Sequence, residues 1–99
     1  MAVQAKAAAD LMKAVAHEGR LMILCHLVGG EKSVSELEYL IGARQAAVSQ
    51  QLARLRLEGL VTSRRDGKAI YYSIGDGKVL QLIETLHALF CDDEARLPS

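Results

Sequence analysis

The segment from residue 44 to residue 74 most constrains the fold, because its apolar residues change from helical spacing to alternation. Val48, Leu52 and Leu55 are four and three residues apart, which places them on one face of a helix. Further on, Ile70, Tyr72 and Ile74 fall at every second position after an Asp66-Gly67 pair, a pair favoured at two-residue hairpin turns. The segment is therefore predicted to be a helix followed by a β-hairpin.

The same segment concentrates positive charge in a chain whose net charge is zero. Between residues 44 and 68 there are six basic and two acidic side chains, a net charge of +4, so the remainder carries −4. The six cations are Arg44, Arg54, Arg56, Arg64, Arg65 and Lys68. Taken alone, a charged turn is best interpreted as a solvated loop. Beside a helix with one polar face, however, these cations are well placed to reach DNA phosphates.

Four other helices are indicated around this segment. Residues 2–16 are rich in Ala and carry apolar residues at helical spacing, and residues 20–28 form a second apolar stretch that ends at two glycines. Ser33 followed by Glu36 is a capping-box pattern that begins a short helix ending near Ile41. Asp76 can cap a last helix. Its apolar stripe consists of Val79, Leu82, Ile83, Leu86 and Phe90.

The order of these elements predicts a winged helix-turn-helix. Two helices joined by a tight turn at Gly42-Ala43 form the helix-turn-helix, and the hairpin that follows forms the wing. We predict one mainly α (α+β) domain over residues 1–99, with the motif at about 33–58 and the wing at about 60–74. A chain of 99 residues buries a modest core, which favours support from a partner subunit.

The predicted fold assigns DNA-binding roles to individual residues. The N-terminal half of the recognition helix normally enters the major groove, where Gln can bind adenine through two hydrogen bonds. The residues expected to contact base edges are Gln45, Ser49 and Gln50. Those expected to contact the DNA backbone are Arg44, Arg54 and Arg56. The wing is expected to contribute Arg64, Arg65 and Lys68.

Several other classes of protein have little support. There is no run of about 18 apolar residues and no export-signal pattern, so we expect a cytoplasmic protein that does not bind membranes. There is also no paired-carboxylate site, no phosphate-binding glycine loop and no nucleophile with an evident base. We therefore expect neither an enzyme nor a bound cofactor.

Three motifs, taken in their order and spacing, resemble the ArsR/SmtB family of bacterial winged-helix repressors. They read A-H-E-G-R-L-M-I-L-C-H-L at 16–27, S-V-S-E-L at 33–37 and A-V-S-Q-Q-L-A-R-L-R-L-E-G-L-V at 47–61. The match covers nearly the whole chain. This resemblance implies a homodimer through the first and last helices, at about 4–16 and 76–91, that binds a palindromic operator until an inducer is sensed.

The chain departs from the broad family at three places. Arg44 occupies a position where relatives often have Ser or Thr, and a cation at a helix N-terminus is unfavourable by roughly a few tenths of a kcal/mol. Gln51 occupies the position of a common His. Metal sensors of the family carry a Cys-x-Cys pattern in the third helix and an Asp/His series in the last. Residues 33–38 read S-V-S-E-L-E and the last helix lacks that series, which weakens a metal-sensing interpretation.

The two cysteines, Cys25 and Cys91, lie on the second and the last predicted helices. From the residues alone, Cys25 lies on an apolar stripe, where a lone Cys is usually only a small hydrophobe, and Cys91 could face solvent. Their positions, in I-L-C-x-L and after an aromatic near the chain's last helix end, resemble the dithiol of the sulfide- and redox-responsive SqrR/BigR/HlyU subgroup. In that subgroup, reactive sulfur species or oxidants bridge the two thiols and DNA affinity falls.

The main hypothesis is therefore a dithiol-based repressor that binds DNA when reduced and is released when Cys25 and Cys91 are bridged. Two alternatives stay open. One is a metal-responsive repressor, in which the two cysteines join His87 and His26 or His17 in a soft-metal site, although these histidines are scattered. The other is a winged-helix anti-repressor or protein-interaction module without an inducer of its own.

Overall fold

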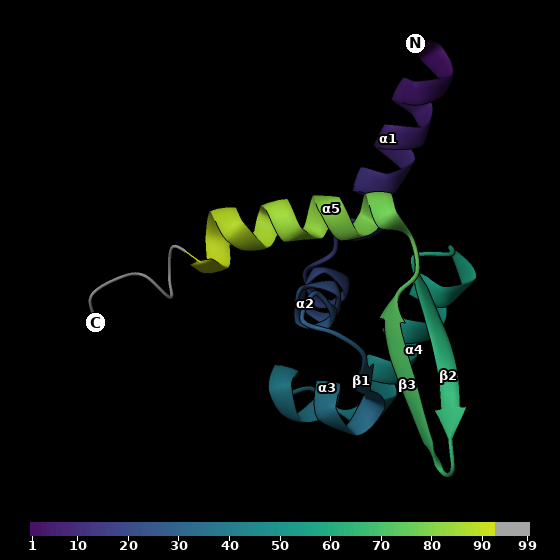
Figure 1. Cartoon of the computed structure of the whole chain (residues 1–99), viewed down its shortest axis with the longest axis vertical. Coiled ribbons are helices and arrows are strands. Elements are labelled where there is room, and N and C mark those ends of the chain that lie inside the picture. Colours follow the sequence, from purple (N-terminus) through teal and green to yellow (C-terminus); the bar gives the residue numbers. More distant parts are fainter. Residues whose placement is uncertain (93–99) are drawn as a thin grey trace.

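The structure, a computed structural model, describes residues 1–92, with the side chains of residues 91 and 92 left undescribed. Its helices are α1 (Ala2–Val15), α2 (Glu18–Leu27), α3 (Val34–Ile41), α4 (Gln45–Leu57) and α5 (Gly77–Leu86), which continues as the π-helix η1 (His87–Asp92). Its strands are β1 (Lys32–Ser33), β2 (Val61–Asp66) and β3 (Ala69–Ile74) (Figure 1). The predicted winged helix-turn-helix is confirmed, with α2 beginning two residues before the expected position.

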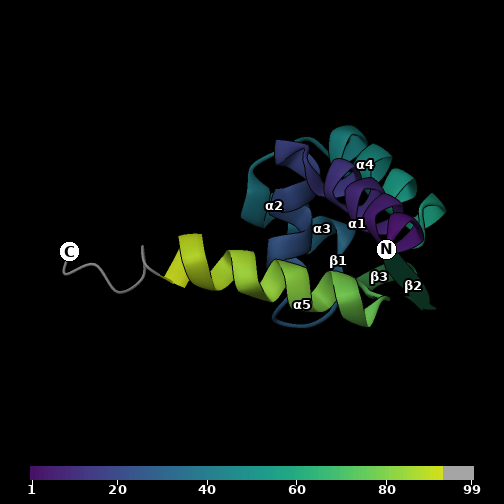
Figure 2. The same ribbon diagram turned by 90° about the horizontal axis from the view of Figure 1, so that it is seen from above.

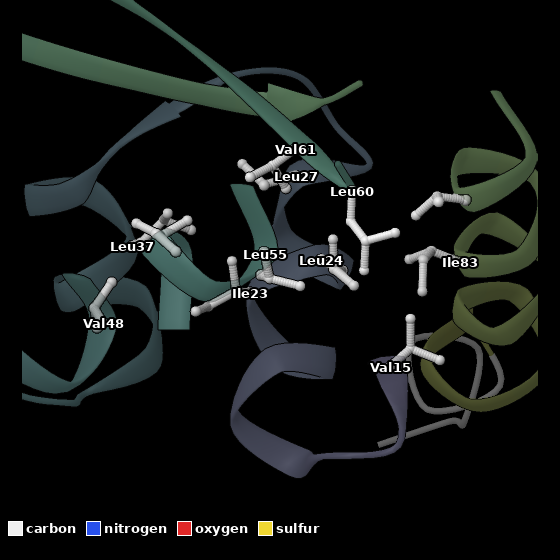
Figure 3. Packing of buried hydrophobic residues seen from close by; sticks show 12 residues of the cluster. Val15, Ile23, Leu24, Leu27, Leu37, Val48, Leu55, Leu60, Val61 and Ile83 are labelled. Atoms are coloured by element: carbon white, nitrogen blue, oxygen red, sulfur yellow. The ribbon is translucent and has the colours of Figure 1, made fainter. Parts of the chain in front are cut away.

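One hydrophobic cluster holds the helices against the base of the wing. Val48, Leu52 and Leu55 of α4 are 2%, 0% and 0% exposed, which confirms the predicted stripe and leaves the opposite face of α4 to solvent. Burying each such side chain stabilises the fold by roughly 1.5–3 kcal/mol. Leu24 of α2 and Leu60 before β2 are directed toward Ile83 of α5 (Figure 3), so α5 is packed on the same core.

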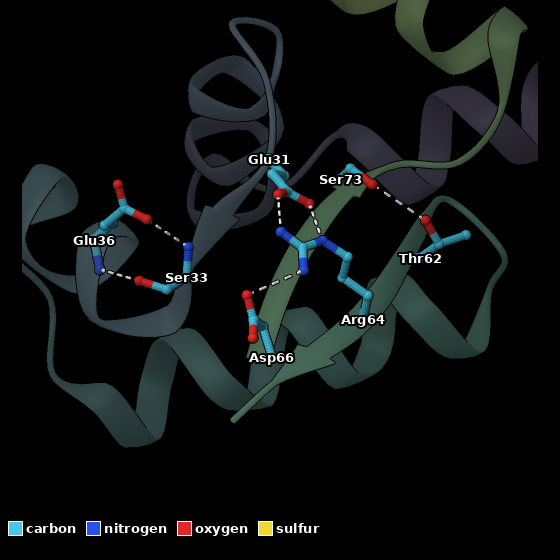
Figure 4. A network of polar contacts seen from close by, with 7 residues as sticks. All are labelled: Glu31, Ser33, Glu36, Thr62, Arg64, Asp66 and Ser73. Atoms are coloured by element: carbon cyan, nitrogen blue, oxygen red, sulfur yellow. Dashed lines mark hydrogen bonds and ion pairs between the residues drawn. The ribbon is translucent and has the colours of Figure 1, made fainter. Parts of the chain in front are cut away.

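The predicted helix caps are present at both α3 and α5. The Ser33 hydroxyl accepts a hydrogen bond from the Glu36 amide at 3.1 Å, and the Ser33 amide donates to the Glu36 carboxylate at 2.9 Å (Figure 4). Gly42, with φ of 74°, then ends α3 in a left-handed conformation that suits glycine. At α5, the Asp76 carboxylate accepts from the amide of Lys78 at 2.7 Å. Ser33 and Asp76, both predicted as capping residues from the sequence, are therefore the N-caps of α3 and α5.

The apolar stripe of the last helix is shorter than predicted. Val79 and Ile83 are buried and Leu82 and Leu86 pack beside them, but Phe90 is 70% exposed. Hydrogen bonds in a π-helix run from residue i to residue i+5, so η1 does not continue the 3.6-residue repeat beyond Leu86. Phe90 therefore lies outside the core cluster that Val79 and Ile83 enter.

The wing differs from the prediction in its turn and in its number of strands. Asp66 pairs with Ala69, so the two-residue turn is Gly67-Lys68 and not Asp66-Gly67. Gly67 has φ of 64°, and glycine at the first turn position is typical of a type II′ hairpin. The third strand, β1, was not predicted, because two residues are too short to show alternation. Strand order is β1-β3-β2, which joins the wing to the segment that begins α3.

Helices α1 and α5 lie on the side of the molecule away from α3 and the hairpin tip (Figure 1). Seen from above, the end of α5 extends beyond the other helices (Figure 2). These two helical segments expose large apolar side chains, among them Val3 at 80%, Met12 at 56%, Leu89 at 57% and Phe90 at 70%. In the part of the chain that the structure describes, no helix is long and apolar enough to span a membrane.

Candidate nucleic-acid interface and thiol pocket

The outer face of α4 carries the residues predicted to contact bases. Gln45, Ser49 and Gln50 are all exposed and lie in the N-terminal half of the helix. Gln45 also lines a groove of about 230 Å³ together with Lys68 of the wing turn and residues 33–35 of α3 and its cap. The fold therefore brings the start of the recognition helix and the wing together. Gln51 is half-buried and lies near Gly19 of α2, away from this face.

The three arginines of α4 and its cap lie in different surroundings. Arg44 is the N-cap residue and is exposed, and its side chain makes no capping hydrogen bond. Arg56 is exposed near the end of the helix. Arg54 lies 3.5 Å from Glu58 and lines a groove with residues of α1 and α2. The structure thus groups Arg54 with an acidic partner on the α1 side, and not with the cations of the wing.

The wing cations also divide into two kinds. Arg65 and Lys68 are exposed, and neither forms an ion pair with a described residue. The Arg64 guanidinium, by contrast, binds both carboxylate oxygens of Glu31, with Nε donating to Oε2 at 2.8 Å and Nη2 donating to Oε1 (Figure 4). Its Nη1 lies 3.7 Å from Asp66, and its central carbon lies 4.8 Å from the centre of the Tyr71 ring.

Sequence reasoning did not single out Glu31 as a functional residue. It precedes β1, the strand that the sequence did not predict, and its partner is 33 residues away. Hydrogen bonds from Arg64 hold the pKa of the Glu31 carboxyl below its usual value, so the carboxylate stays charged at neutral pH. The one available signal was the position of an acidic residue directly after Gly29-Gly30 and before a capped helix.

Cys25 lines a second, mostly apolar pocket of about 510 Å³ between α2 and the end of α5. Its side chain is half-buried and packs against the core. The other lining residues are Glu18, Leu21, Met22, His26, Leu86, His87 and Phe90. Cys91 directly follows Phe90 in η1, but its side chain lies outside the described part of the structure. Cys91 is thus the neighbour in sequence of Phe90, and Phe90 lines the same pocket as Cys25.

Four of the residues that line this pocket are ionisable: Glu18, Cys25, His26 and His87. Burial, with smaller electrostatic contributions from Lys32 and His87, holds the pKa of His26 below its usual value, which favours its neutral form. Among the side chains that the structure describes, no three His, Cys, Asp or Glu residues are grouped closely enough to hold a metal ion. The metal site considered from the sequence includes Cys91, which lies outside that set.

Comparisons with known proteins agree with this architecture. The sequence profile described as "Bacterial regulatory protein, arsR family" matches residues 17–63. The biofilm growth-associated repressor of Agrobacterium fabrum is 45% identical over 97 residues, which cover 98% of this chain and 83% of that protein.

Two solved structures are similar over nearly the whole chain. The transcriptional repressor BigR of Xylella fastidiosa has a TM-score of 0.87 and 45% identity, covering 95% of this chain and 93% of that one. Reduced HlyU of Vibrio cholerae has a TM-score of 0.88 and 42% identity, covering 92% and 96%. The chain therefore belongs to the arsR family of bacterial regulatory proteins, among the BigR- and HlyU-like DNA-binding transcriptional regulators, and is not an enzyme.

Proposed function

We propose that this protein is a dithiol-based transcriptional repressor of the cytoplasm. As a homodimer it binds a palindromic operator while Cys25 and Cys91 are reduced, and it leaves the operator when the two are bridged. The inducers are reactive sulfur species or oxidants. The repressor names of the relatives in Agrobacterium fabrum and Xylella fastidiosa support the direction of regulation.

Several features of the surface support operator binding by a dimer. The exposed polar face of α4 and the unpaired wing cations Arg65 and Lys68 face solvent, as a major-groove helix and a wing require. Large exposed apolar side chains on α1 and η1, such as Met12 and Leu89, are the kind of surface that a second copy covers. Two recognition helices related by a two-fold axis would read half-sites about 10 base pairs apart.

The observation that carries the thiol switch is the pocket shared by Cys25 and Phe90, the residue directly before Cys91. A thiolate attacks the outer sulfur of an organic persulfide, forms a Cys–S–SH group and expels the organic thiolate. The second thiolate then attacks the protein-bound sulfur of that group, forms a disulfide and releases hydrosulfide. If both cysteines are persulfidated first, the same displacement leaves a trisulfide.

A peroxide reaches the same bridge by another sequence. A thiolate reduces the peroxide to an alcohol or water and becomes a sulfenic acid, and the second thiolate displaces hydroxide from it to form the disulfide. Either bridge would tie α2 to the end of α5, and α2 packs directly on α4. The bridge would change the relative pose of the two recognition helices. A coupling free energy of about 1.4 kcal/mol between bridge formation and DNA binding is enough for a tenfold loss of DNA affinity.

Intact-mass analysis paired with operator binding tests this proposal. Treatment with persulfide is expected to raise the protein mass by added sulfur or to lower it by two hydrogens, and treatment with peroxide to lower it by two hydrogens. Each treatment should also lower the affinity for the operator. The matched variants Cys25→Ser and Cys91→Ser cannot form the bridge, so they should bind the operator with the same affinity before and after treatment. If the wild-type mass and affinity are unchanged by both reagents, the switch is refuted while operator binding stands.

The same purified protein separates the alternatives. Zinc bound in proportion to protein, and lost in Cys25→Ser, would favour a metal-responsive repressor instead. Sequence-specific, salt-sensitive operator binding would exclude a module that binds only proteins.

A further inference from the structure

We propose that Arg64 is a positioning residue that fixes the wing to the body of the domain, and that it does not contact DNA phosphates. This inference concerns how the wing is held, and it requires operator binding but not the thiol switch. The cations that would contact DNA from the wing are then Arg65 and Lys68 alone.

The sheet register places Arg64 and its partners on one face. Arg64 pairs with Tyr71 across the hairpin, and Tyr71 pairs with Ser33 of β1. Glu31 lies two residues before Ser33, directly ahead of β1, and its carboxylate accepts hydrogen bonds from Arg64. Glu31 therefore reaches across β3 to Arg64, with the Tyr71 ring between the two strands, and the contact spans the full width of the sheet.

The charge of the Arg64 guanidinium is already balanced by acidic neighbours, which makes it a weaker ligand for a DNA phosphate than a cation without an ion pair. Two of its nitrogens bind the Glu31 carboxylate, the third lies 3.7 Å from Asp66, and its central carbon lies 4.8 Å from the Tyr71 ring centre. The cluster of Arg64, Glu31 and Asp66 carries a formal charge of −1. A planar fork bound to both oxygens of one carboxylate defines an orientation as well as a distance. Such a group is suited to holding a hairpin in one pose.

Glu31 is attached to the helix-turn-helix, because the chain runs from Glu31 through β1 directly into α3. Arg65, the next residue of β2, points to the opposite face of the sheet. It offers a matched control, because it has the same side chain on the same strand without an ion pair to a described residue.

The test is operator binding over a range of salt concentrations, with each variant confirmed to be folded by circular dichroism. Arg65→Gln is expected to reduce the magnitude of the slope of log K against log salt by about 0.9 for each wing. The charge-neutral pair Glu31→Gln/Arg64→Gln is expected to keep the wild-type slope. It should weaken binding about twofold to fivefold for each wing, since the contact is partly exposed.

Conservative substitutions separate positioning from charge. Lysine keeps the positive charge but cannot form the two-pronged contact with a carboxylate. Arg64→Lys should therefore weaken operator binding by a similar factor while keeping the wild-type salt slope. If the neutral pair flattens the salt dependence as Arg65→Gln does, or if Arg64→Lys binds like the wild type, Arg64 contacts DNA and the proposal is overturned.

Discussion

Replacing Arg44 with serine is expected to stabilise the protein and to weaken operator binding at the same time. Arg44 is the N-cap of α4, with φ of −70° and ψ of 149°, which is the extended conformation that a capping residue adopts. Its side chain accepts no hydrogen bond from the first turn. Ser33, the N-cap of α3, accepts such a bond from Glu36 at 3.1 Å. Serine at position 44 can make the same contact for α4.

The gain in stability has two parts. A serine cap in place of a residue that cannot cap contributes about 1 kcal/mol. Removing a cation from the positive end of the helix dipole contributes roughly 0.3–1 kcal/mol, at the lower end for an exposed side chain. Arg44→Ser is therefore expected to raise the free energy of unfolding by about 1–2 kcal/mol. Arg44→Gln removes the charge without supplying a cap, so it should gain only the smaller, electrostatic part.

The loss in binding comes from the charge alone. If Arg44 neutralises one phosphate, both substitutions reduce the magnitude of the salt slope by about 0.9 for each recognition helix on the DNA. At about 0.15 M salt this corresponds to roughly a fivefold loss of affinity for each helix, because counterion release scales with that slope. The serine and glutamine variants should therefore bind equally weakly while differing in stability.

Two assays decide the matter: denaturant unfolding of the three proteins, and operator binding by fluorescence anisotropy from low to moderate salt. If Arg44→Ser is no more stable than Arg44→Gln, the capping argument is refuted. If both variants keep the wild-type salt slope, Arg44 does not lie at a phosphate. The unusual residue before the recognition helix would then need another explanation.

Other substitutions test the fold that presents the interface. Ser33→Ala should lower the free energy of unfolding by about 1 kcal/mol in denaturant titrations, because α3 loses its cap. Gly75→Ala would place its Cβ 2.6 Å from the Thr62 methyl and should lower the free energy of unfolding by about 1–2 kcal/mol. In the Thr62→Ser background, which lacks that methyl, a double-mutant cycle should show that this loss of stability disappears. Leu52→Ala, at a position with no exposed area, should cost about 2–5 kcal/mol by the same titrations. The Ser33 amide lowers the pKa of Glu36, so the contribution of Glu36 to stability is complete above its usual pKa of 4.5 and is lost as pH falls through the lower folded value; an NMR titration midpoint at or above 4.5 would contradict this.

Sequence signals were reliable where the deciding interactions lie within one helical turn. The stripe of Val48, Leu52 and Leu55 and the Ser33–Glu36 box each involve residues three or four positions apart, so the sequence displays them directly. The hairpin was predicted, but its turn was displaced by one residue. Asp66-Gly67 and Gly67-Lys68 both contain the required glycine, and only the pairing of Asp66 with Ala69 distinguishes them.

The sequence by itself determined the order of the elements, the caps and the concentration of cations between residues 44 and 68. Only the tertiary structure decided which cations face solvent and which are held by acidic partners. Arg64 and Arg65 are adjacent and chemically identical, yet the alternation of a strand turns one toward Glu31, 33 residues away, and leaves the other without an ion pair to a described residue. The pocket that joins Cys25 to Phe90 likewise depends on how α2 meets the end of α5. Contacts of this kind are set by packing and strand register across the chain, which local spacing does not record.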